Sequence, residues 1–361
     1  MSIFKKNKNY PLGVDVSDSS IRFAQLNKGL KNRIGLRAFG SIDLSQGLIS
    51  EGIIKNEEEV VKSLKKIFSS SRLSKPNSSE VIASLPENKT FVKLIKIQKS
   101  TNKLEDVVEA ELEKHIPFHP REIYYDWQEI RKGKDHHLVL VGAAPRSVVD
   151  QYYDVFSRSG LTLVALEIEP IAVCRSILDE ETPEFQNTKG KNHILIDFGF
   201  SHTTIIFYSR DTVLFTSETQ MSGEKITQEI AGSLKVGRKK AEKYKLSLSK
   251  KNKNYKKIVK IIDSNMEELN VKLGRVIDFY YENFSERGPI ESVFFVGGGA
   301  YIPKIEDYIS CLPASVNIDK GDPLSKISQG EKAKKIFQEE GNLTFTVAVG
   351  LALSQIFIKK F

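Results

Sequence analysis

The strongest constraint on the fold is a short acidic turn that occurs twice, about half a chain length apart. Residues 12–23 read LGVDVSDSSIRF, and residues 195–208 read LIDFGFSHTTIIFY. In each stretch an apolar run reaches an aspartate (Asp15 or Asp197), passes through a turn of small residues, and resumes as a second apolar run. The pattern is Asp-x-Ser-x-Ser in the first copy and Asp-x-Gly-x-Ser in the second. Two such hairpins predict a duplicated unit.

A turn of this kind has a definite chemical use. It points successive backbone N–H groups into a concavity that suits phosphate oxygens, and hydroxyl groups add donors. An aspartate just before the turn suits a hydrated Mg²⁺ ion. An ordinary β-turn uses the same residue types. Because the turn recurs at the start of each half, we interpret the pair as phosphate-binding turns.

Two later segments are candidates for a nucleoside site. Gly297, Gly298 and Gly299 follow the apolar strand SVFFV, and a helix is predicted from Pro303. Consecutive glycines let the chain lie against a ligand, and a helix N-terminus favours an anion; the alternative is a packing turn. Glu242 and Lys245 fall one helical turn apart, either as a surface ion pair or as contacts to a ribose or adenine.

Strand hairpins alternate with helical patterns along the chain, which indicates an α/β fold. The polar stretch 180–192 is the expected linker between the halves. No apolar stretch approaches the ~20 residues that span a bilayer. The only two cysteines, Cys174 and Cys311, lie far apart in apolar contexts, which fits a reducing compartment.

The chain carries a net charge of +8, concentrated in two basic runs. One run contains Lys5, Lys6 and Lys8, and the other extends over residues 235–260. We interpret the second run as a solvated loop and helix face rather than a nucleic-acid site, since single-strand binders need several stacking aromatic residues. His115 and His119 have the spacing of a zinc pair, but Pro117 between them argues against one helical face.

Several longer segments carry a family resemblance. The two turns, the stretches GEKITQEIA and AEKYK, and FFVGGGAYIPKIEDYI occur in the order typical of the actin-like ATPases, which include actin, Hsp70 and FtsA. EAELEKHIPFHPREIYYDW, SGLTLVALEIEP and FTVAVGLALS resemble the PilM family of type IV pilus assembly proteins. The resemblance extends from Leu12 to about Ser354.

The resemblance implies a two-lobed actin-like fold of duplicated RNase H-like domains, with an FtsA-like extra subdomain in the first lobe. The first-lobe core would comprise 10–86 and 161–190, and the inserted subdomain 87–160. The second-lobe core would comprise 191–221 and 287–361, with the final helix free to return to the first lobe. Residues 222–286 would form a helical subdomain on the nucleoside side.

The resemblance also implies a site for ATP and Mg²⁺, although the sequence leaves hydrolysis open, with a weak ATPase as one outcome and no catalytic base assigned. The metal would lie near Asp15 and Asp197, held through water. The implied cofactor-binding residues are Asp15, Ser17, Ser19 and Ser20 in the first turn, Asp197, Gly199, Ser201 and Thr203 in the second, and Gly223, Glu242, Lys245, Gly297, Gly298 and Gly299 around the nucleoside.

The implied role is a cytoplasmic scaffold at the inner face of the cytoplasmic membrane, in a type IV pilus or a related pseudopilus. The inserted subdomain would bind the N-terminal tail of a PilN-like membrane protein, so that membrane contact is indirect. We expect no nucleic-acid partner; pilus motor ATPases and self-association stay open. Trp127, beside Tyr124 and Tyr125, belongs either to the core or to the peptide groove. The alternatives are an FtsA-like filament former and a small-molecule kinase of the same superfamily.

Overall fold

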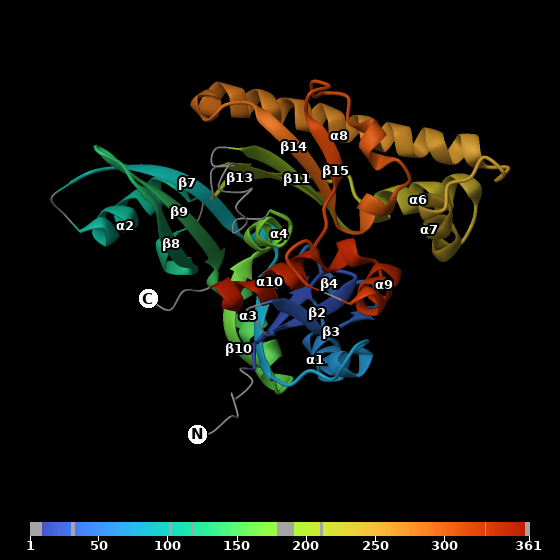
Figure 1. Ribbon diagram of the computed structural model, residues 1–361, viewed down its shortest axis with the longest axis horizontal. Helices are drawn as coiled ribbons and strands as arrows, with labels where there is room; N and C mark the ends of the chain where they lie inside the picture. The colour runs from blue at the N-terminus through green and yellow to red at the C-terminus, as the bar shows by residue number, and fades with distance from the viewer. Residues whose placement is uncertain are drawn as a thin grey trace. The chain divides into compact units, whose positions relative to one another are not determined.

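The computed structural model (Figure 1) describes residues 9–29, 33–100, 103–116, 119–178, 191–209, 212–328 and 330–357. Most of the expected linker and all of Lys5, Lys6 and Lys8 therefore lie outside the described residues. The chain divides into two compact units: Met1–Glu180 with Asp322–Phe361, and Glu181–Gly321. No helix among the described residues is both long enough and apolar enough to cross a membrane.

The first unit is built on a five-stranded sheet with the order β10-β6-β1-β2-β3. Strands β1, β2 and β3 form an antiparallel meander, whereas β1, β6 and β10 run parallel. Helices α1 and α3 cover one face, with an apolar core that includes Phe23, Tyr152 and Phe156. The elements of this layer are β1 (Leu12–Val16), β2 (Ser20–Lys28), β3 (Ile34–Asp43), β4 (Ile49–Ser50), β5 (Ile53–Ile54), α1 (Glu57–Lys66), β6 (Glu80–Leu85), α3 (Arg146–Arg158), β10 (Thr162–Ile168) and α4 (Glu169–Ile177).

Between β6 and α3 the chain forms a separate antiparallel sheet of order β7-β9-β8, backed by one helix. Its own small core joins β-branched strand residues such as Val139 and Val141 to Val108 and Leu112 of the helix. This is the segment in which the sequence predicts an inserted subdomain. Its elements are β7 (Phe91–Gln98), α2 (Leu104–His115), β8 (Ile123–Lys132) and β9 (His136–Pro145).

The C-terminal segment returns to the first unit through α9 (Glu331–Glu339) and α10 (Thr346–Phe357). Helix α10 packs on β1 and α4, and glycine permits both approaches. A Cβ on Gly13 would overlap the α10 backbone at Ala348, and a Cβ on Gly350 would overlap the α4 backbone at Ala172. The sequence placed 287–361 with the second lobe and left only the final helix free to return; in the structure the return begins at Asp322.

The second unit contains a sheet of order β13-β12-β11-β14-β15. Strands β11, β12 and β13 form the meander, and β11, β14 and β15 run parallel. Strand for strand this repeats β3-β2-β1-β6-β10, so the predicted duplication is confirmed. The Tyr280 ring of α8 stacks on Phe207 of β12, with ring centroids 5.5 Å apart. The elements are β11 (Asn192–Phe198), β12 (Thr203–Ser209), β13 (Thr212–Thr219), α6 (Gly223–Leu234), α7 (Arg238–Leu246), α8 (Tyr255–Phe284), β14 (Ile290–Val296) and β15 (Asn317–Lys320).

One local expectation is wrong. The helix predicted from Pro303 is replaced by two short 3₁₀ turns, at Gly298–Tyr301 and Ile305–Tyr308. Lys304 adopts a left-handed backbone conformation with φ of 59°, which interrupts any continuous helix at that point. Pro313 then prevents a helix from extending further.

Candidate functional site

The two acidic turns are closed by the same backbone hydrogen bond. In the first, the Ser17 N–H donates to the Ser20 carbonyl at 3.0 Å; in the second, the Gly199 N–H donates to the His202 carbonyl at 3.1 Å. Each turn begins two residues after its aspartate, and each aspartate is the last residue but one of its strand. The repeated pattern seen in the sequence is therefore a repeated hydrogen-bonded hairpin.

The first aspartate is buried, which is unusual for a carboxylate. Asp15 is only 6% exposed, and it accepts a hydrogen bond from the Ser84 hydroxyl of β6 at 3.2 Å. Burial raises the pKa of Asp15, while the charge of Arg22 and the Ser84 hydrogen bond act to lower it. Since burial prevails, the site favours a bound proton or a nearby cation. That chemistry fits a magnesium-holding residue.

The hydroxyl groups of the first turn are partly used within it. The Ser17 hydroxyl donates to the Ser20 carbonyl at 3.0 Å, and it lies 3.2 Å from the Ser20 hydroxyl. Ser20 is buried, whereas Ser17 and Ser19 are half-buried. The Ser20 side chain thus supports the turn from inside, and Ser17 and Ser19 are the more accessible candidates for a phosphate.

The second turn is hydrogen-bonded to the N-terminus of α6. The N–H of Gly223 donates to the Gly199 carbonyl at 3.1 Å, and the N–H of Glu224 donates to the Phe200 carbonyl at 3.0 Å. The Thr203 hydroxyl donates to the Met221 carbonyl at 2.7 Å and is fully buried. In this structure the Thr203 side chain therefore stabilises the turn through a hydrogen bond to the segment that precedes α6. Ser201 is half-buried, and its hydroxyl pairs with the His202 ring at 3.1 Å.

The glycine turn packs against the end of β11. A Cβ on Gly297 would collide with the carboxylate of Asp197, and a Cβ on Gly299 would collide with the Phe198 ring. Gly297 also has φ of 77°, a conformation that favours glycine. Gly298, between them, faces solvent. The structure thus brings Asp197 and the glycine turn together, and packing accounts for Gly299.

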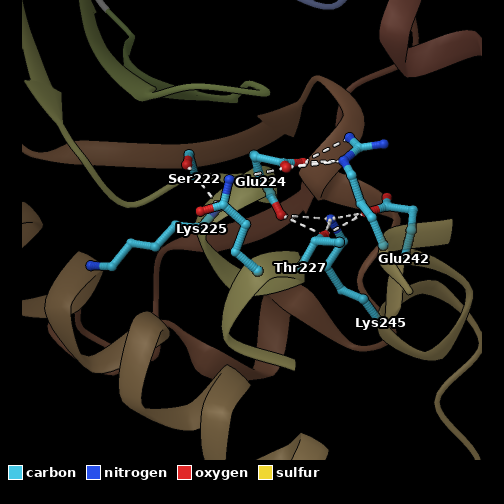
Figure 2. A network of polar contacts seen from close by, with 9 residues as sticks. Ser222, Glu224, Lys225, Thr227, Glu242 and Lys245 are labelled. Carbon is cyan, nitrogen blue, oxygen red and sulfur yellow. Dashed lines mark hydrogen bonds and ion pairs between the residues drawn. The ribbon is translucent and has the colours of Figure 1, made fainter. Parts of the chain in front are cut away.

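A buried polar network joins α6 to α7 (Figure 2). The Lys245 ammonium donates to the Gly223 carbonyl at 2.8 Å and to the Thr227 hydroxyl at 2.9 Å, and it lies 2.9 Å from the Glu242 carboxylate. Lys245 is 3% exposed, so the pair is not a simple surface ion pair. Burial lowers the pKa of Lys245, and Glu242 opposes that shift.

A second ion pair closes the same network. Both oxygens of Glu224 accept from Arg238, at 2.7 to 2.9 Å, and Arg238 also lies 5.4 Å from the centre of the Phe200 ring. Burial acts to raise the pKa of Glu224, but the hydrogen bonds from Arg238 and Gln228 outweigh it and hold that pKa below its usual value. The α6 N-terminus, α7 and the second turn are thereby fixed to one another.

A groove lies within the first unit, beside the inserted sheet. It has a volume of about 410 Å³ and is lined mainly by apolar side chains. It is bordered by Tyr124 to Gln128 of β8 and by Ala165 to Ile168 of β10. Neighbouring residues of a strand point to opposite faces, so a lining of consecutive residues means that the strand edges face the groove. Among the described residues, no further strand pairs with β8 or β10 on that side.

The aromatic cluster left open by the sequence contributes to this groove. Trp127 packs against the core of the inserted sheet and also lines the groove. Tyr124 and Tyr125 are 42% and 38% exposed at its rim. The Tyr124 hydroxyl donates to Asp150 at 3.2 Å, and the guanidinium of Arg146 lies 4.1 Å from the ring centre. Trp127 therefore belongs to the core of the inserted sheet and also lines the groove.

A sequence model described as type IV pilus assembly protein PilM matches residues 13–356. The chain belongs to this family. It is also similar to the cell division protein FtsA of Streptococcus pneumoniae serotype 2 (strain D39 / NCTC 7466). The two are 28% identical over 261 residues, which cover 65% of this chain and 55% of FtsA. The chain thus spans about half the length of that curated relative.

Solved structures support the same fold. The PilM-PilN type IV pilus biogenesis complex contains a chain with a TM-score of 0.80 and 22% identity, covering 96% of this chain and 98% of that one. The ethanolamine utilization protein EutJ from Carboxydothermus hydrogenoformans has a TM-score of 0.56 and 15% identity, covering 96% and 90%. The predicted PilM-family membership and the actin-like α/β fold are confirmed.

Three further side chains, those of Asp18, Thr227 and Arg238, have structural roles that the sequence motifs did not predict. Asp18 accepts from the backbone N–H groups of Glu51 and Gly52, each at 3.0 Å, and so ties the first turn to a neighbouring loop. The position of Asp18 inside the Asp-x-Ser-x-Ser turn is a sequence signal from which a structural role could have been predicted. Arg238 and Thr227 lie too far in sequence from their partners for spacing to reveal them. Among the described residues, no group of three His, Cys, Asp or Glu side chains could hold a metal, and His119 instead caps a 3₁₀ turn.

Proposed function

We propose that this chain is a cytoplasmic, ATP-binding scaffold at the inner face of the cytoplasmic membrane. In this proposal it holds the N-terminal tail of a PilN-like membrane protein in the groove of the first unit. The observation that carries the proposal is the lining of that groove by two strand edges. An extended peptide can add to such an edge through main-chain hydrogen bonds, while side-chain pockets select its sequence.

The nucleotide part of the proposal rests on the repeated turns. ATP would be held by the backbone N–H groups and the accessible hydroxyls of Ser17, Ser19 and Ser201, with Mg²⁺ near Asp15 and Asp197. The buried, poorly solvated carboxylate of Asp15 fits that role. The network of Glu242 and Lys245 would border the nucleoside. Bound Mg²⁺ would offset the negative charge of the phosphates.

The similarity to a solved structure supports a PilN-like protein as the partner. The most similar structure reported above is described as a PilM-PilN complex. In the present chain, a tail residue entering the groove would contact Trp127 and the apolar side chains of β10. We propose that nucleotide binding alters the affinity for the tail, so that the two ligands are coupled.

The test is calorimetry with a synthetic peptide that matches the cytoplasmic N-terminal tail of a PilN-like protein. Ala165 lines the groove, and the large side chain of Ala165→Trp should fill it and lower peptide affinity by at least about tenfold. Val164→Trp is the matched control, because Val164 is 45% exposed and does not line the groove. Equal peptide affinity in both variants would contradict the proposed site.

A further inference from the structure

Residues 235–260 hold more of the positive charge than any other part of the chain. This segment contains twelve lysines and arginines and one acidic residue, out of 54 basic and 46 acidic residues in total. Without it, the chain would carry slightly more acidic than basic side chains. The excess of basic residues in this one segment is therefore larger than the net positive charge of the whole protein.

The structure places that charge on one end of the second unit. The segment runs from the end of α6 through α7 and a connecting turn into the first turns of α8 (Figure 1). Its exposed lysines form no ion pair with any carboxylate among the described residues, unlike Lys62, Lys114 or Lys225 elsewhere in the chain. We call the following set the basic patch: Lys235, Lys239, Lys240, Lys243, Lys250, Lys251, Lys253, Lys256, Lys257 and Lys260.

The connecting turn between α7 and α8 is an ordered part of this surface. The N–H of Asn252 donates to the Ser249 carbonyl and the N–H of Tyr255 to the Asn252 carbonyl, each at 2.9 Å. Three lysines of the patch are displayed on this turn. Leu246, which precedes it, is 37% exposed, and Leu248 is half-buried. The patch therefore combines unpaired cations with accessible apolar side chains.

We propose that the basic patch docks on the anionic surface of a lipid bilayer. Clusters of lysines near such a surface contribute about 1 kcal/mol each, and apolar residues among them can enter the headgroup region. Nucleic acid is the weaker fit because single strands need a groove with stacking aromatic rings. The two aromatic residues of the segment, Tyr244 and Tyr255, are half-buried, and Lys240 already lies over the Tyr244 ring at 5.8 Å. This contact goes beyond the proposed function, since it needs no peptide tail.

The test is co-sedimentation of the full chain, without any peptide, with vesicles of phosphatidylcholine alone or mixed with phosphatidylglycerol. We expect binding only to the phosphatidylglycerol vesicles, with a strong loss as salt rises from about 0.1 M to about 0.5 M. The variant that combines K250Q, K251Q, K253Q, K256Q and K257Q should bind these vesicles at least about tenfold more weakly. Because none of these lysines pairs in the structure, its fold should persist, which circular dichroism can check.

The matched control combines K65Q, K66Q, K332Q, K334Q and K335Q, five exposed lysines of the first unit with the same charge change. It should retain vesicle binding. An equal loss in both variants would mean that only net charge matters and would overturn the proposal. So would binding to pure phosphatidylcholine, or binding of single-stranded RNA at a salt concentration where vesicles do not bind. A weaker but measurable loss in L246S would support insertion of the apolar side chain.

Discussion

The Tyr152 hydroxyl donates to the Gly52 carbonyl at 3.1 Å, although the two residues are 100 positions apart. Tyr152 belongs to α3, which follows the inserted sheet, and Gly52 belongs to the loop whose N–H groups bind Asp18 of the first acidic turn. Asp150 on the same helix accepts from Tyr124 at the groove rim. Helix α3 therefore contacts both the rim of the groove beside β8 and the loop that fixes the first turn.

The first prediction concerns this link. Tyr152→Phe removes the hydroxyl that donates to the buried Gly52 carbonyl. Because that carbonyl loses this hydrogen bond, the free energy of unfolding should fall by about 1 kcal/mol. Urea denaturation measures the change. The neighbouring Tyr153→Phe is the control, because Tyr153 is 61% exposed and its loss of a hydroxyl should have no effect. A similar change in both variants would show that the Gly52 contact contributes nothing.

The second prediction concerns the network in Figure 2. Lys245→Met keeps the length of the side chain but removes the ammonium group that binds the Gly223 carbonyl, Thr227 and Glu242. Unfolding should become easier by about 2 kcal/mol, because a buried carbonyl and a carboxylate lose a charged partner. ATP affinity should fall as well.

Lys243→Met on the same helix serves as the comparison, since Lys243 is exposed. It should change neither stability nor ATP affinity. If Lys245→Met is folded and binds ATP with the affinity of the wild type, the network is not part of a nucleotide site.

The third prediction concerns Asp15. Asp15→Asn should weaken Mg²⁺-dependent ATP binding by at least about tenfold, since the neutral amide cannot balance a cation. Because folding raises the pKa of Asp15, its ionised form is less favourable in the folded chain than in the unfolded chain at neutral pH. The nucleotide-free variant should therefore be at least as stable as the wild type.

Calorimetry with ATP, with and without Mg²⁺, measures the first effect, and thermal unfolding of the nucleotide-free protein measures the second. Asp43→Asn, at the exposed end of β3, is the matched control. Unchanged ATP affinity in Asp15→Asn would remove Asp15 from the site.

The fourth prediction is a pH dependence set by His193. This side chain is 7% exposed in β11, and burial, aided by the charge of Lys191, lowers its pKa from 6.5 to about 4. The neutral ring is thus favoured in the folded chain. Above pH 6.5 the ring is neutral in the unfolded chain as well, so protonation of His193 takes nothing from the free energy of unfolding there. As the pH falls from about 6.5 to about 4, the unfolded chain takes up a proton more readily, and up to about 3 kcal/mol of stability is lost.

The free energy of unfolding, measured by urea denaturation from pH 7.5 to pH 4.5, checks this slope. In His193→Gln the side chain no longer titrates, so the slope over that interval should be shallower than in the wild type. An identical slope would assign the acid sensitivity to other groups.

The sequence by itself determined the features that depend on short spacing. The Asp-x-Ser-x-Ser and Asp-x-Gly-x-Ser patterns fixed two hairpins with the same turn hydrogen bond, and the spacing of Glu242 and Lys245 fixed a pair on one face of α7. The alternation of strands and helices gave the fold class. These features are local, because the backbone period and the turn residues decide which side chains meet.

Only the tertiary structure decided the rest. The return of α10 to the first unit depends on close backbone approach at Gly13 and Gly350, which no local pattern encodes. The hold of Asp18 on the loop at Gly52, the pairing of Glu224 with Arg238 and the groove between β8 and β10 likewise join residues far apart in sequence. Such contacts form when packing of the whole unit brings distant segments together, so their partners are visible only once the chain has folded.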